Sequence, residues 1–124
     1  MATEIEPLVD AAQAMKTRLL ADLRAALKER RACEARVVRT LVAAIDNAEA
    51  PPAHAGPGPM AWHEFRSGAA EVERLFLSYA DVRRTLQAEI DERESAAAEL
   101  ERLGRAGEAT ALRSEADLAR RYLA

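Results

Sequence analysis

The sequence has one cysteine, few aromatic residues and no long apolar run, and each shortage excludes a class of protein. Cys33 has no second cysteine to pair with, so an internal disulfide is impossible. No stretch approaches the roughly 20 apolar residues that a membrane span requires. No charged-then-apolar secretory segment opens the sequence. We therefore expect a soluble cytoplasmic protein without a membrane partner.

The abundant residues are Ala, Leu, Arg and Glu, which favour helix, and 124 residues suit a single domain. The predicted fold class is therefore all-α, a small four-helix bundle-like domain over residues 1–124. Apolar residues recur three and four positions apart, as on one face of a helix. This spacing predicts four helices, near residues 7–30, 33–49, 79–103 and 107–123. Residues 50–77 are expected to form an irregular segment, which begins with a Pro- and Gly-rich loop that cannot continue a helix.

Three short signals predict where helices begin or end. Pro7 suits a first helical turn, because its missing N–H costs nothing there. Ser78-x-x-Asp81 has the spacing of a capping box, in which a side chain accepts a hydrogen bond from a free N–H at the helix start. Gly104 can adopt the left-handed conformation that commonly ends a helix.

No residue pattern predicts catalysis. His54 and His63, with Glu64 beside the second, fit no standard metal motif. Cys33 lacks the partners of a nucleophile and is expected to be a buried, inert helix residue. The Gly56–Gly58 stretch lacks the Lys-Ser/Thr ending of a phosphate-binding loop. We therefore expect no catalytic residue, no metal and no cofactor.

Charge is unevenly distributed along the chain. Residues 16–39 contain eight basic and three acidic residues, although the net charge of the whole chain is −3. Such a stretch indicates either an anionic partner or a solvated helix face that is rich in arginine. Arg24, Lys28 and Arg31 are predicted to share one face of the first helix and are the candidate RNA-binding residues.

Two charges interrupt the apolar faces of the last two helices. Arg93 lies between Ile90 and Ala97, and Glu115 occupies a comparable position on the final helix. A buried charge needs a partner, and the short turn at Gly104 should make these helices antiparallel. We predict a structural ion pair between Arg93 and Glu115. Arg39 and Glu49 are candidate further members, and a charge held for a ligand is the alternative.

Two blocks of the sequence resemble the GatB/YqeY family, small helical proteins similar to the C-terminal region of the aspartyl/glutamyl-tRNA amidotransferase B subunit. The first block is LLADLRAALKERRACEARVVRTLVAAIDNAE, in which Arg39, Ala44, Ile45, Asn47 and Glu49 stand at matching positions. The second is EIDERESAAAELERLGRAGEATALRSEADLARRYL, which runs through Gly104-Arg105 to Glu115 and Tyr122-Leu123. Over the whole chain, the resemblance covers residues 16–49 and 81–123.

The resemblance implies an accessory module that associates with tRNA or another RNA. The amidotransferase's catalytic centre lies in a separate domain, so no catalysis is implied here, and no DNA partner is expected. The alternative is a helical protein–protein docking module that meets a translation-related partner through apolar surface near Trp62 and Phe65. An RNA binder should gather its arginines on one exposed face, whereas a docking module should expose an apolar patch.

Overall fold

The computed structural model describes residues 10–51 and 74–124, and these two ranges are helical with no strand. They contain four α-helices and a closing 3-10 turn: α1 (Ala11–Lys28), α2 (Ala32–Glu49), α4 (Tyr79–Arg102), α5 (Ala106–Arg120) and η2 (Arg121–Leu123). The all-α prediction is confirmed. The predictions about Pro7, the two histidines, Trp62 and Phe65 lie outside the described residues.

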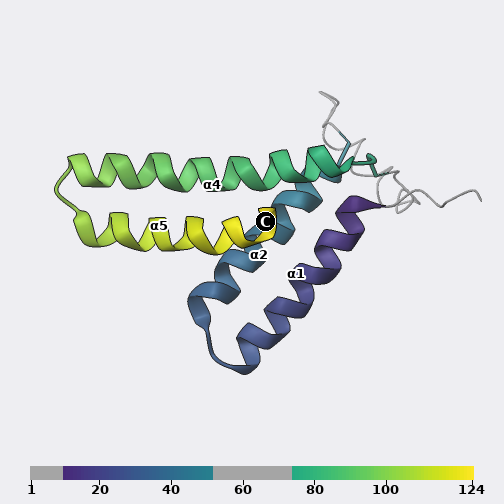
Figure 1. The fold of residues 1–124 in the computed structure, drawn as a ribbon, viewed down its shortest axis with the longest axis horizontal. Coiled ribbons are helices and arrows are strands. Elements are labelled where there is room, and N and C mark those ends of the chain that lie inside the picture. The colour runs from purple at the N-terminus through teal and green to yellow at the C-terminus, as the bar shows by residue number, and fades with distance from the viewer. Residues whose placement is uncertain (1–9, 52–73) are drawn as a thin grey trace, which may run out of the picture.

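The helices form two antiparallel hairpins that cross (Figure 1). One consists of α1 and α2, and the other, longer one consists of α4 and α5. In this view the turn between α1 and α2 lies at the bottom and the turn between α4 and α5 at the left, and α2 passes across the second hairpin. Where the hairpins cross, α2 packs against both α4 and α5. The starts of α1 and α4 and the end of α2 lie at the same end of the molecule, whereas α5 ends partway along α4.

The two hairpin turns share one backbone geometry. In the first, Arg30 is left-handed with φ 59°, and the Arg31 N–H donates to the Ala26 carbonyl at 2.8 Å. In the second, Gly104 has φ 76°, and the Arg105 N–H donates to the Leu100 carbonyl at 2.8 Å. Both are Schellman motifs, which satisfy the last helical carbonyls. The predicted stop at Gly104 is confirmed, whereas the first helix ends at Lys28, earlier than predicted.

Side-chain caps decide where α1 and α4 begin. The Asp10 carboxylate accepts a hydrogen bond from the Gln13 N–H at 3.0 Å, so α1 begins at Ala11, later than the predicted start near residue 7. Ser78 and Asp81 form the predicted capping box, with both reciprocal hydrogen bonds at 3.0 Å.

The core fills the place where the hairpins cross. Its largest fully buried side chains come from α1, α2 and α4: Leu19, Val37, Val38, Leu41, Ile45, Val82, Leu86 and Ile90. Each such side chain stabilises the fold by about 1.5–3 kcal/mol relative to an exposed one. The helix α5 contributes small buried residues, Ala109, Ala116 and Ala119, which let it approach its neighbours closely. Tyr122 of η2 completes the core.

Candidate functional site

The structure separates Arg31 from the other two candidate RNA-binding residues, Arg24 and Lys28. Arg24 and Lys28 are exposed on α1, one turn apart. Arg31 is the N-cap residue of α2, so the prediction of one shared helix face is wrong. The reason is the left-handed Arg30, which reverses the chain before residue 31. Arg31 is also neutralised, with its Nε 3.0 Å from a Glu29 oxygen and its Nη1 on Glu34.

Other charges of the basic stretch are engaged within the fold. Lys16 is buried, and Arg36 Nη2 lies 3.2 Å from Glu115 Oε2. Glu34 holds Arg31 and lies 3.4 Å from Arg121. The pKa of Glu34 is lowered, mainly by the hydrogen bond from Arg31 and also by the charge of Arg121, although partial burial acts to raise it. The stretch is therefore less free to meet phosphates than its sequence suggests.

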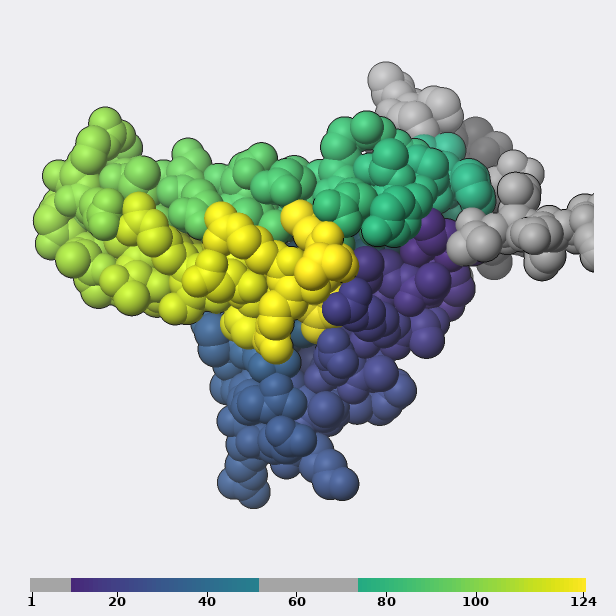
Figure 2. All heavy atoms as spheres, viewed as in Figure 1, coloured from purple at the N-terminus to yellow at the C-terminus, as the bar shows by residue number. Residues whose placement is uncertain are grey.

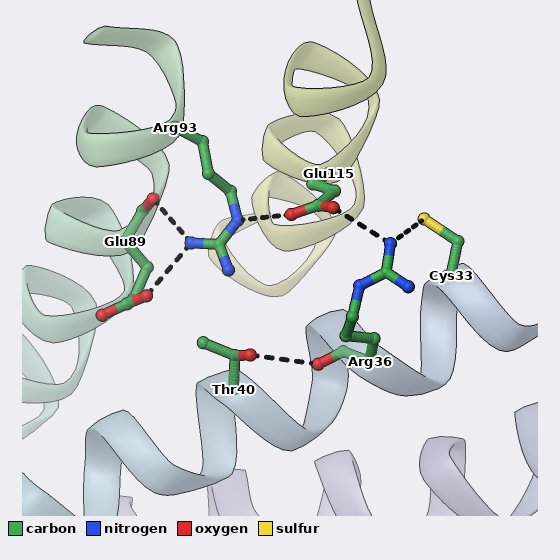
Figure 3. Close-up of polar contacts among 6 residues, drawn as sticks. All are labelled: Cys33, Arg36, Thr40, Glu89, Arg93 and Glu115. Carbon is green, nitrogen blue, oxygen red and sulfur yellow. Dashed lines mark hydrogen bonds and ion pairs between the residues drawn. The ribbon is translucent and has the colours of Figure 1, made fainter. Parts of the chain in front are cut away.

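Arg93 and Glu115 meet where α2, α4 and α5 come together (Figure 3). Arg93 Nε lies 3.1 Å from Glu115 Oε1, and the two side chains are 12% and 15% exposed. Arg93 Nη1 donates to the main-chain oxygen and the carboxylate of Glu89, at 3.0 Å each. Arg36 of α2 engages the second oxygen of Glu115. The predicted contact between Arg93 and Glu115 is therefore present, and the cluster links α2, α4 and α5.

Arg39 and Glu49, the other two predicted members, do not belong to this cluster. Arg39 is exposed on α2 and forms no ion pair with any described residue. Glu49 is the last residue of α2, and a rise of 1.5 Å per residue places it roughly 20 Å along the helix from Arg36. Its partners are different residues.

A second ion-pair cluster, which we did not predict, is more deeply buried. Lys16 Nζ lies 2.6 Å from Glu49 Oε1 and 2.9 Å from Asp46 Oδ1, and the Lys16 and Glu49 side chains are 8% and 6% exposed. Arg74 Nη1 lies 3.3 Å from Glu49 Oε1, and the Leu75 N–H donates to the Glu49 carbonyl at 2.8 Å. The cluster therefore joins α1, α2 and the segment that leads into α4.

The sequence did contain a signal for Lys16. It follows Ala12 by four residues and precedes Leu19 by three, so it lies on the buried face of α1. Burial alone lowers the pKa of Lys16, but hydrogen bonds and charge attraction from Glu49 and Asp46 outweigh it, so the pKa is raised. Lys16 is charged in the folded protein and is not available to an anionic partner.

Cys33 is exposed, so the prediction of a buried thiol is wrong. It lies in the first turn of α2, which projects beyond the crossing of the hairpins. Its Sγ is 3.9 Å from Arg36 Nη2 (Figure 3). In residues 10–51 and 74–124, no group of three His, Cys, Asp or Glu residues is placed to hold a metal ion.

A groove of about 520 Å³ lies between the first half of α1, the start of α4 and η2. We call it the aromatic groove, and its lining residues are Ala11, Ala14, Met15, Arg18, Phe76, Ser78, Tyr79, Val82, Arg83 and Tyr122. Phe76 and Tyr79 are 59% and 64% exposed. The three segments adjoin on the face shown in Figure 2, where purple, green and yellow atoms meet.

The η2 wall of the groove is fixed by polar contacts. The Tyr122 hydroxyl donates to Asp22 Oδ2 at 2.5 Å, and the Arg18 guanidinium lies 4.6 Å from the Tyr122 ring centre. Arg83 Nη1 donates to the Leu123 carbonyl at 2.7 Å. Burial, reinforced by the Asp22 carboxylate, raises the pKa of Tyr122. These contacts hold η2 against α1 and α4 and so fix this wall of the groove.

Among the helices that the structure describes, none is both long enough and apolar enough to cross a membrane. A comparison with protein-family models finds no match, and searches of curated proteins and of solved structures find none either. The similarity to the GatB/YqeY family therefore stays a prediction that is based on the two sequence blocks alone.

Proposed function

We propose that this chain is a non-catalytic docking module that binds a partner protein through the aromatic groove. The observation that supports the proposal is the exposure of Phe76 and Tyr79 beside a groove with a largely apolar lining. Exposed apolar patches of this kind mark interaction sites, and aromatic anchors commonly dominate binding energy. The groove's volume suits a few side chains of a partner segment.

Association with tRNA or another RNA is the second candidate. Arg24 and Lys28 support it, since both are exposed and neither is ion-paired within the part of the chain that the structure describes. However, the exposed side of α1 also carries Leu20 and Leu27, which offer nothing to phosphates. A nucleic-acid footprint depends on several free cations, and much of this basic stretch is engaged internally. The geometry therefore favours protein docking.

The resemblance to the GatB/YqeY family supports a translation-related partner for either candidate. A docking module for a synthetase, an amidotransferase or a ribosomal protein would need the groove but no catalytic residues. Neither buried ion-pair cluster contributes a residue to the lining of the groove, so both leave it open to a partner.

The experiment compares native capture by three tagged forms of the full chain. The wild type is set against the double variant Phe76→Ser/Tyr79→Ser and against a control, Leu103→Ser. Leu103 is 61% exposed, lies at the turn between α4 and α5, and does not line the groove. The control removes a comparable exposed apolar side chain. We expect one or more proteins to be retained by the wild type and the control and lost by the groove variant. The purified partner should then bind the groove variant at least tenfold more weakly.

The same capture tests the RNA candidate. Recovered RNA is sequenced, and the variant Arg24→Gln/Lys28→Gln is included with and without nuclease treatment. If all forms retain the same proteins, the docking proposal is wrong. If RNA is retained by the groove variant and lost by the Arg24/Lys28 variant, with affinity falling steeply with salt, the RNA candidate replaces it.

A further inference from the structure

We infer that the partner segment in the aromatic groove is acidic as well as apolar. This inference depends on the proposed docking function and adds the chemistry of the partner. It follows from the charges that line the groove and from what those charges contact.

The described lining has two charged side chains, Arg18 and Arg83, and both are positive. They come from different helices, α1 and α4. Arg18 donates to the Arg121 carbonyl at 3.3 Å, and Arg83 donates to the Leu123 carbonyl at 2.7 Å. Neither forms an ion pair with a carboxylate in residues 10–51 or 74–124.

Most other arginines of the described residues do have such a partner, although Arg24, Arg30 and Arg39 form no ion pair there. Five arginines outside the groove pair with an acid three residues away or on the facing helix: Arg84, Arg102, Arg105, Arg113 and Arg120. Arg83 has no acid three or four residues away on α4. Arg18 has Asp22 one turn later, but that carboxylate accepts the Tyr122 hydroxyl. The two groove arginines thus lack the carboxylate partner that most others have.

Arg83 Nη1 also donates to the Tyr79 hydroxyl at 3.5 Å. A guanidinium has five N–H donors, so these contacts still leave most of the hydrogen-bonding capacity of both arginines unused. Carboxylates are its natural partners, because two parallel N–H···O bonds match their geometry. In the same lining, the exposed rings of Phe76 and Tyr79 and the side chain of Met15 offer apolar contact. The ligand that fits is a peptide segment with a large apolar anchor and Asp or Glu close beside it.

The test uses a phage-displayed library of random peptides, about 12 residues long, selected on the folded full chain. Peptides that also bind the Phe76→Ser/Tyr79→Ser variant are removed, so those that remain depend on the groove. We expect them to be enriched in Asp and Glu around a large apolar residue. Synthetic peptides from the selection should bind at least tenfold more weakly when their acids are replaced by Lys.

The arginines are tested with a matched pair of double variants. Arg18→Gln/Arg83→Gln should weaken binding of the selected acidic peptide at least tenfold, whereas Arg18→Lys/Arg83→Lys, which keeps both charges, should retain most of it. Fluorescence polarisation measures the affinities, and circular dichroism verifies that each variant is folded. The difference between the Gln and Lys variants should shrink at high salt, because salt screens exposed charges.

Groove-dependent peptides without acidic enrichment would overturn the inference, as would equal binding by the Gln and Lys variants. A selection that yields no groove-dependent peptide would also overturn it. None of these results depends on the native capture. Failure of this inference, in which the groove binds peptides without a preference for acids, can therefore be distinguished from failure of the docking proposal itself.

Discussion

Removal of Lys16 should destabilise the protein more than removal of any exposed charge. Lys16→Met keeps the apolar stem of the side chain but leaves the Glu49 carboxylate, 6% exposed, without its partner at 2.6 Å. Breaking a buried pair in this way costs 3–5 kcal/mol as an order of magnitude. Arg74 still lies 3.3 Å from Glu49, so we expect about 3 kcal/mol, the lower end of that range.

The assay is a double-mutant cycle of urea unfolding followed by circular dichroism. Lys16→Met and Glu49→Gln are made alone and together. Each single variant should lower the free energy of unfolding by about 2–3 kcal/mol, and the double variant should lose much less than the sum, because neither charge is then left unpaired. The matching fall in melting temperature is on the order of 10 °C.

Arg102→Met is the control for this cycle. Arg102 pairs with Glu99 on α4, but both side chains are exposed, so water solvates whichever charge remains. We expect a change within about 1 kcal/mol. Additive losses in the Lys16–Glu49 cycle, or a Lys16→Met loss no larger than that of the control, would refute the reasoning.

Three further predictions concern the turns, the Arg93–Glu115 cluster and alkaline pH. Arg30→Gly should raise stability by about 0.5–1 kcal/mol, since a left-handed non-glycine residue is strained. Gly104→Ala should lower stability by about 1 kcal/mol, because a φ of 76° is strained for alanine even though its Cβ would meet nothing within 4 Å. Thermal melts check both variants, and equal effects of one sign would contradict the prediction. Arg93→Met should cost about 2 kcal/mol, and in a double-mutant cycle with Glu115→Gln the losses should fall short of additivity. Burial and Asp22 raise the pKa of Tyr122, so its phenol stays protonated in the folded protein at a pH where the unfolded chain ionises. The contribution of this group to stability is therefore fully present below the ordinary pKa of 10.0 and is lost as the pH rises further. Denaturant titrations across this pH range should show a smaller loss for Tyr122→Phe.

The sequence by itself determined the helices and several of their ends. Helical spacing of apolar residues is a local property, so it predicted the all-α class and placed α2, α4 and α5 within a few residues. The Ser78/Asp81 cap and the Gly104 stop are also local, because each depends on residues a few positions apart. The end of α1 was less clear, since an arginine stands where glycine usually marks the turn.

The tertiary structure decided which charges meet and what remains exposed. The pairing of Arg93 with Glu115 could be predicted, because the short turn at Gly104 makes their helices antiparallel. The pairing of Lys16 with Glu49 could not, because it depends on how α1 and α2 are rotated about their axes, which the sequence did not specify. The aromatic groove joins Arg18, Tyr79 and Tyr122, which are far apart in the chain. Only the crossing of the two hairpins brings them together, because that crossing depends on how complementary helix surfaces pack rather than on any local pattern.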